Sequence, residues 1–99
     1  MEEILADELI GLEVEVADST DPSKIGIKGR VVDETMKTLV VETERGRKVL
    51  PKAECKFIFD YRGKRVEVDG KLLVARPEDR IKKGKHLARK WRIPKFFLK

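Results

Sequence analysis

The sequence predicts a mainly β protein, a small antiparallel barrel with short helices near both ends of the chain. Short runs rich in Val, Ile, Leu and Thr recur at spacings of roughly ten residues, with turn-forming residues between them and no long helical pattern. Residues 26–43 form the clearest unit, two such runs joined by a polar connector, which is typical of a β-hairpin. Gly26 and Gly29 lie inside its first strand, where glycine marks a bulge, a sharp bend or a close backbone approach. A bent first strand helps a small sheet to close.

The N-terminal segment, residues 2–10, has the pattern of a short amphipathic helix, with Gly11 available to end it. Four apolar residues recur there at helical spacing: Ile4, Leu5, Leu9 and Ile10. A helix this short is marginal in water by itself. Its apolar face is therefore expected to pack on the barrel or on a partner protein.

Alternating apolar and acidic side chains at residues 12–16 indicate a strand with one buried and one solvated face. A loop of turn formers follows at residues 18–23. The next strand, residues 25–32, is expected to point three apolar side chains inward: Ile25, Ile27 and Val31. Three cations lie beside or between them: Lys24, Lys28 and Arg30. They could track a phosphate backbone or form an ordinary solvated face, and the sequence leaves both readings open.

The second half of the barrel is predicted from four further strands. Residues 48–50 follow a turn at 44–47, and Pro51 confines that strand to an edge or a strand end. The strand ending at Tyr61 has one wholly apolar face, which carries Cys55, Phe57, Phe59 and Tyr61. Cys55 is therefore expected to be an inert core residue. After Val66 and Val68, the dipeptide Asp69-Gly70 predicts a hairpin that leads into a strand over residues 72–74.

The C-terminal part of the chain is basic. Residues 77–84 have the pattern of a short helix, and residues 85–93 could continue as a helix until Pro94. The net charge of +5 combines −4 for residues 1–79 with +9 for residues 80–99. We expect one domain over residues 1–83 and a basic tail over residues 84–99. Such tails commonly bind nucleic acid, although a purely solubilising role is the alternative.

The aromatic residues of the tail have two readings. Trp91, Phe96 and Phe97 could stack on bases or pack back on the barrel. The tail is expected to be mobile in the free protein and to become ordered on RNA.

Composition excludes several classes of protein. The single Cys rules out a disulfide framework and a Cys-based zinc site within one chain. Apolar runs are far shorter than a membrane span, and the acidic N-terminus is not a signal peptide, so a cytoplasmic protein is expected. The chain has no Asn or Gln, and 41% of its residues are charged, which favours a thermophilic source.

No catalytic set is evident. His86 has no partner residue in a metal or acid–base pattern, and it is expected to contact phosphate or nothing. The chain has no phosphate-binding glycine loop and no base near its serines or threonines, so no cofactor is expected. Asp33, Glu34 and Asp69 could in principle hold a metal for a nuclease, but acids are common in turns. The sequence argues against a self-contained enzyme.

Several short motifs, taken in order, resemble a known family. They are residues 19–23 (STDPS), 26–29 (GIKG), 31–35 (VVDET), 38–39 (TL), 51–52 (PK) and 76–80 (RPEDR). Together they look like archaeal ribonuclease P protein component 1, a relative of the eukaryotic 29-kilodalton subunit, over residues 9–83. Met36 and Lys37 depart from the pattern at a turn where the family often has Asn, which agrees with the amide-free composition.

The resemblance implies an Sm-like, SH3-like barrel that binds the RNA subunit of ribonuclease P and pairs with a small zinc-ribbon protein subunit. In that enzyme the RNA carries the catalysis, and the holoenzyme removes the 5′ leader from precursor transfer RNA. Cations expected to contact RNA are Lys24, Lys28, Arg30, Lys52, Arg76, Arg80, Lys82, Lys83, Lys85, Arg89, Lys90 and Arg92. Residues expected to contact the protein partner are Leu5, Leu9 and Ile10.

Three other functions remain alternatives at this stage. They are another RNA-binding small barrel, such as a ribosomal protein, a protein-interaction barrel of SH3 type, and a metal nuclease. An SH3-type site needs an aromatic groove, which only Tyr61 could begin to supply.

Overall fold

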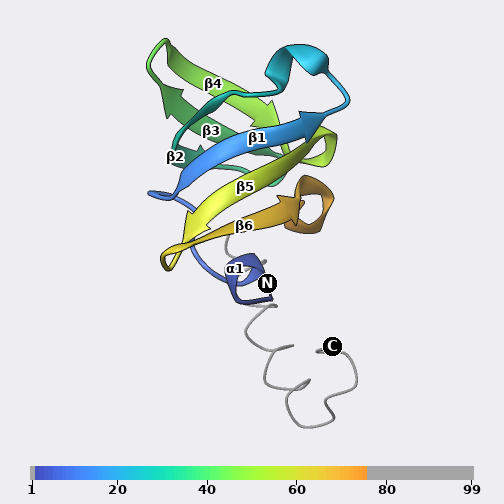
Figure 1. Ribbon diagram of the computed structural model, residues 1–99. Helices are drawn as coiled ribbons and strands as arrows, with labels where there is room; N and C mark the ends of the chain where they lie inside the picture. Colours follow the sequence, from blue (N-terminus) through green and yellow to red (C-terminus); the bar gives the residue numbers. More distant parts are fainter. Residues whose placement is uncertain (1, 76–99) are drawn as a thin grey trace, which may run out of the picture.

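Six strands form one antiparallel sheet in the order β4-β3-β2-β1-β5-β6 (Figure 1). The structure, a computed structural model, describes residues 2–75. The strands are β1 (Glu13–Ser19), β2 (Lys28–Glu34), β3 (Thr38–Thr43), β4 (Gly46–Pro51), β5 (Cys55–Tyr61) and β6 (Lys64–Asp69). One α-helix, α1 (Glu2–Leu5), and three 3-10 helices, η1 (Pro22–Lys24), η2 (Lys52–Glu54) and η3 (Gly70–Leu73), complete the fold. The expected helices at 77–84 and 85–93, and the behaviour of the tail, lie outside the described residues.

The sheet curls so that β3 and β4 pass behind β1 (Figure 1), and buried side chains from all six strands contribute to the core. β5 alternates buried and more exposed residues along its whole length, as the sequence predicts. Its Phe57 and Phe59 rings lie 5.8 Å apart between centroids, and Cys55 is buried beside them in the same core cluster. The burial of Cys55 confirms that it is a core residue, and burial raises the pKa of its thiol.

The first strand of the central hairpin bends close to its neighbour. A Cβ on Gly29 would collide with the carbonyl oxygen of Glu42 on β3, so the predicted close approach is confirmed. The β2–β3 ladder also shifts register between Val31 and Asp33, which marks a bulge.

The strand begins later than predicted, because a turn with Gly26 at φ 90° precedes it. Ile25 therefore lies outside the sheet and is 47% exposed, which corrects the expectation that it points inward.

The expected strand over residues 72–74 is wrong. The Asp69 side chain accepts a hydrogen bond from the Lys71 N–H at 3.0 Å and caps η3, so the chain coils into a 3-10 helix instead of turning back as a hairpin. Among the described strands, β4 and β6 are consequently the two unpaired edges of the sheet. β4 ends at Pro51, which agrees with the predicted edge position.

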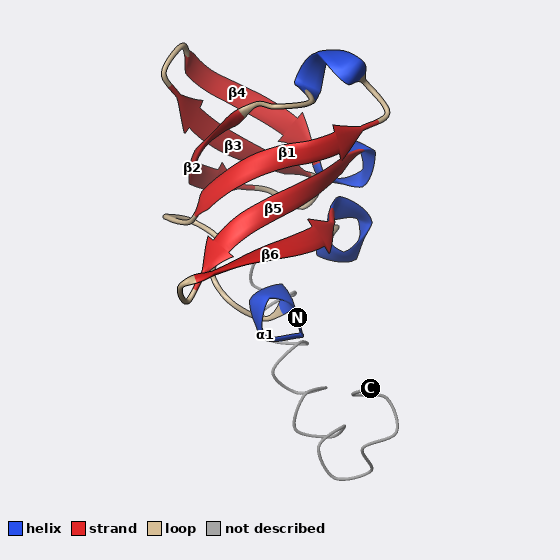
Figure 2. Ribbon diagram, in the orientation of Figure 1, coloured by secondary structure: helices blue, strands red, loops and turns tan. Residues whose placement is uncertain are grey.

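The ends of the sheet are joined by 3-10 helices rather than by a strand ladder. Figure 2 shows η1, η2 and η3 at the same end of the sheet. The backbone of Gly70, at the start of η3, lies so close to the Lys52 carbonyl that any side chain there would collide with it. The structure is therefore the predicted mainly β, small-barrel type of fold, but its sheet is not closed, because β4 and β6 do not pair with each other. The 3-10 helices η2 and η3, which follow these two edge strands, contact each other instead.

The N-terminal helix is shorter than the predicted 2–10 and ends at Leu5. The Asp7 side chain accepts hydrogen bonds from the Glu8 N–H at 2.7 Å and from the Tyr61 hydroxyl at 2.8 Å, which favours a turn at this point. The Gly11 N–H bonds the Val31 carbonyl of β2, so Gly11 belongs to the sheet contact rather than to a helix end. No helix within residues 2–75 is long and apolar enough to cross a membrane.

Candidate nucleic-acid interface

Two of the three cations predicted around β2 are neutralised by carboxylates. Arg30 lies opposite Glu13 on β1, and its guanidinium donates two hydrogen bonds to the Glu13 carboxylate at 2.9 and 3.0 Å. Lys24 bonds the Asp21 carboxylate at 2.9 Å. The hydrogen bonds from Lys24 and Ser23 lower the pKa of Asp21 to about 2, and Asp21 in turn raises the pKa of Lys24. A phosphate at either cation would have to compete with an existing partner.

Cross-strand ion pairs continue over the outer face of the sheet. Arg47 on β4 bonds Glu42 on β3 at 2.9 Å, and Arg65 on β6 lies 3.1 Å from Glu15 and 3.6 Å from Asp60. Each exposed pair contributes only about 0–1 kcal/mol to stability. Their larger effect is electrostatic, because they leave this face with little uncompensated positive charge for a polyanion.

Three other cations meet at a groove between the η1–β2 connection and the β3–β4 turn. Lys28, Arg45 and Lys48 have no ion pair with any residue in the described part of the chain. The groove has a volume of about 480 Å³ and is lined by Ser23, Ile25, Gly26, Ile27, Lys28, Thr43, Glu44, Arg45 and Lys48. Three cations therefore face one carboxylate, that of Glu44.

A neighbouring groove over β1 and β5 has the opposite balance. Lys28 and Arg65 line it together with four acids: Glu13, Glu15, Glu44 and Asp60. Lys28 thus lies at the border between an acidic and a basic surface. We call the basic side, the groove of Lys28, Arg45 and Lys48, the cationic groove.

The sequence reasoning found Lys28 but missed Arg45 and Lys48. The register pairs Thr43 with Gly46, so Glu44 and Arg45 form the tip of the β3–β4 hairpin. Because β2 is the other neighbour of β3, this tip lies beside the start of β2. The turn at residues 44–47 was predicted from the sequence, but only the strand order brings the three cations together.

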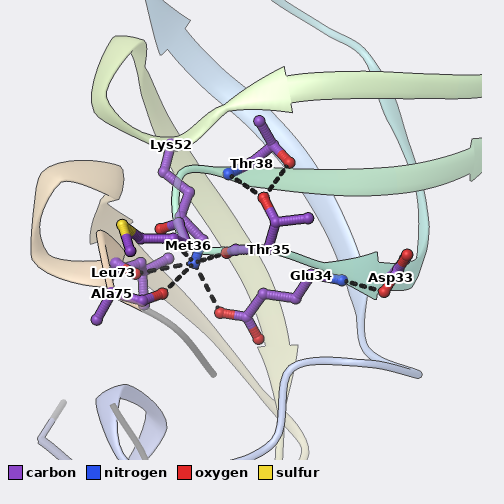
Figure 3. Close-up of polar contacts among 8 residues, drawn as sticks. All are labelled: Asp33, Glu34, Thr35, Met36, Thr38, Lys52, Leu73 and Ala75. Carbon is purple, nitrogen blue, oxygen red and sulfur yellow. Dashed lines mark hydrogen bonds and ion pairs between the residues drawn. The ribbon is translucent and has the colours of Figure 1, made fainter. Parts of the chain in front are cut away.

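Lys52 is not a surface cation, which corrects its assignment as a phosphate contact. Its side chain is 0% exposed, and its ammonium bonds the Glu34 carboxylate at 2.8 Å. Figure 3 shows the same nitrogen surrounded by backbone carbonyl oxygens, those of Thr35 at 2.7 Å, Leu73 at 2.9 Å, Met36 at 3.2 Å and Ala75 at 3.3 Å. An ammonium has three protons, so these five acceptors share them. Lys52 therefore ties the β2–β3 turn to the end of η3 from inside the protein.

The residues predicted to meet a protein partner are differently exposed. Leu9 is 0% exposed and belongs to the core, which corrects the expectation that it contacts a protein partner. Leu5 is partly buried against the core, and Ile10 is 43% exposed. The N-terminal segment has thus packed on its own sheet, and Ile10 retains the most accessible surface of the three.

The remaining predicted RNA contacts lie outside the described residues. They are Arg76, Arg80, Lys82, Lys83, Lys85, Arg89, Lys90 and Arg92. Within residues 2–75 no group of three or more His, Cys, Asp or Glu side chains is arranged to hold a metal ion.

Comparisons with known proteins agree with one another. The family model described as ribonuclease P/MRP, subunit p29, matches residues 2–83. Ribonuclease P protein component 1 of Methanocaldococcus jannaschii is 54% identical over 81 residues, which cover 81% of this chain and 85% of the relative. The protein of the same description from Archaeoglobus fulgidus is 50% identical over 82 residues, covering 83% of this chain and 80% of the relative.

A solved structure, that of Mth11, described as a homologue of human RNase P protein Rpp29, superposes with a TM-score of 0.56 at 49% identity. It covers 76% of this chain and 99% of that one. A match over most of the chain, relatives at about half identity and a shared fold lead to one conclusion: the chain belongs to the p29 family of ribonuclease P protein subunits.

Proposed function

We propose that this chain is the RNA-binding subunit of an archaeal-type ribonuclease P that assists the RNA-catalysed removal of the 5′ leader from precursor transfer RNA. One observation carries the proposal beyond family membership. Arginines on the sheet are paired with carboxylates, whereas Lys28, Arg45 and Lys48 share the cationic groove with a single acid. Unpaired cations are the groups that release counterions from a phosphate backbone when they bind it.

The chain would assist through binding rather than chemistry. Cys55 is buried with a raised thiol pKa, and the Tyr61 pKa is raised to about 12 by burial and by its hydrogen bond to Asp7. Neither group is ready to lose a proton near neutral pH, as a nucleophile or general base must. In this proposal the RNA subunit carries the reaction, and the protein neutralises phosphates and holds the RNA in its active shape.

The partners follow from the same proposal. They are the ribonuclease P RNA and the small zinc-ribbon protein subunit, with precursor transfer RNA as an indirect partner. The assembled enzyme would act in the cytoplasm. The surface around Ile10, which stays exposed beside the buried Leu9, supports an apolar contact for the protein partner. The cationic groove lies at a different part of the sheet, so RNA and protein would occupy different faces.

A cleavage assay tests the proposal. Precursor transfer RNA is incubated with the RNA subunit, with and without this chain and the zinc-ribbon subunit. We expect the chain to stimulate 5′-leader removal and to cleave nothing by itself. Failure to stimulate, with a folded protein and an active RNA, would contradict the proposed function.

A salt titration tests the groove. The triple variant K28A/R45A/K48A should flatten the slope of log affinity for the RNA against log salt by about two to three units, since each phosphate contact contributes roughly 0.7 to 0.9. The matched control K56A/K64A/K71A removes three other exposed lysines that have no ion pair within residues 2–75. Equal slopes for the two triple variants would show that the groove has no special role.

A further inference from the structure

We propose that the cationic groove holds an unpaired nucleotide of the bound RNA, with its base against Ile25 and its flanking phosphates on Lys28, Arg45 and Lys48. This inference rests on the proposed function, since it assumes that the chain binds RNA. It adds what kind of RNA the groove accepts, a single-stranded or bulged nucleotide rather than a regular duplex.

The groove has an apolar part that phosphate binding alone does not need. Ile25 is 47% exposed, and Ile27 beside it is partly buried against the core. A Cβ on Gly26 would meet nothing within 4 Å, so the backbone between the two isoleucines is open to a flat ligand. Base faces are apolar and bind to such surfaces once they leave the helical stack.

The apolar part is held in a fixed position. Asp21 caps η1 by accepting hydrogen bonds from the Ser23 N–H and hydroxyl at 3.0 and 2.8 Å. The Gly26 N–H bonds the Val16 carbonyl of β1 at 2.9 Å, which attaches the turn to the sheet. Ile25 lies between these two anchors, so little conformational entropy is lost when a base packs on it.

Charge and size indicate which partner the groove fits. Its cations come from the start of β2, the β3–β4 turn and β4, and Glu44 is the one acid among the residues that line the groove. Three cations on different elements can bind the phosphates on both sides of a nucleotide, whereas a single acidic side chain would contact fewer of them. A volume of about 480 Å³ is in the range of small-ligand sites, about 300–1,000 Å³, and so can hold a nucleotide but not a double helix. In a duplex the base faces are stacked, and Ile25 would stay uncovered.

Binding of two RNA probes tests this inference on the full chain. The probes are a fluorescent single-stranded oligouridylate and a blunt RNA duplex of the same length, measured by anisotropy at one salt concentration. Ile25→Ser should weaken binding of the single strand about fivefold, because the base can no longer cover the aliphatic side chain. Binding of the duplex should stay unchanged. Lys48→Ala should weaken both, because it removes a phosphate contact.

The control is Leu72→Ser, which removes another exposed aliphatic side chain from η3, 59% exposed against 47% for Ile25. It should change neither affinity, and thermal unfolding should show that all variants stay folded. If Ile25→Ser changes both affinities equally or neither, while Lys48→Ala weakens both, the groove binds phosphate only and the inference is wrong although the proposed function stands. If Ile25→Ser spares both RNA probes but weakens the zinc-ribbon subunit, the groove is a protein site. A wild-type chain that fails to bind ribonuclease P RNA would instead overturn the proposed function.

Discussion

Replacing Lys52 by Met should strongly destabilise the protein. Met keeps an unbranched apolar stem of similar length but removes the ammonium that bonds Glu34 and four backbone carbonyls. Breaking a buried ion pair by removing one partner costs about 3–5 kcal/mol. Each buried carbonyl that loses its donor adds about 1–3 kcal/mol, although part of this cost is relieved by relaxation. We expect a loss of about 5 kcal/mol, which for a chain of 99 residues corresponds to a melting temperature lower by about 20 °C or more.

A double variant separates the two causes. Lys52→Met with Glu34→Leu removes both charges, and replacing a buried ion pair by apolar residues is often neutral. The Thr35 and Leu73 carbonyls would still lack their donor, so about 2–3 kcal/mol of the loss should remain. Complete recovery in the double variant would show that only the unpaired charge matters.

Guanidinium unfolding followed by circular dichroism measures both effects. Lys56→Met is the control, because Lys56 lies on β5 at an exposed position and its loss should change stability by less than about 0.5 kcal/mol. A Lys52→Met protein within about 1 kcal/mol of the wild type would refute the view that the ammonium ties the β2–β3 turn to the end of η3.

Three further predictions concern titration and packing. Tyr61 is the only tyrosine, so the absorbance of its phenolate during a pH titration reports this residue alone. The pKa of Tyr61 should be near 12 rather than the ordinary 10.0. The stability that its neutral form contributes should be complete below pH 10 and should be lost as the pH rises toward 12. The carboxyl of Asp21 should titrate near pH 2 by NMR, so the stability that its ionised form contributes should be complete above pH 3.8 and lost as the pH falls through 2. A titration midpoint near 3.8 would contradict the capping hydrogen bonds of Asp21. Gly70→Ala should lower the free energy of unfolding by about 2 kcal/mol or more, because the new Cβ would collide with the Lys52 carbonyl oxygen and lie 2.7 Å from the Cys55 carbonyl oxygen. Denaturant unfolding measures this loss, and Lys71→Ala, at the exposed neighbouring position, should leave the stability nearly unchanged.

Strands with uninterrupted alternation were predictable from the sequence. β3 (Thr38–Thr43) is the second strand of the hairpin predicted over residues 26–43. β5 buries every other residue from Cys55 to Tyr61, because one face of this strand contacts the core throughout. The edge position of β4 followed from Pro51, which has no N–H to donate.

The candidate site was less predictable because its three cations come together only through the strand order. The buried Lys52–Glu34 pair was not predicted either, because it depends on irregular backbone. The register shift between Val31 and Asp33 breaks the alternation of β2, and it lets Glu34 face inward toward Lys52. Simple alternation would not reveal this pair. Both members are charged, so sequence reasoning placed Lys52 on the surface, where lysine usually lies.

The polar network around Lys52 also fixes the point at which the chain leaves the sheet. Ala75 is held by its N–H, which donates to the Met36 carbonyl at 3.0 Å, and by its carbonyl, which accepts from Lys52 at 3.3 Å. Only four residues, 76–79, separate Ala75 from residues 80–99, which contain nine Lys and Arg residues and no acid. The hydrogen bond from Lys52 to Ala75 therefore holds the residue from which the basic segment continues. Losing the Lys52 ammonium would release one end of this anchor, so a buried side chain determines where the basic segment is attached to the fold.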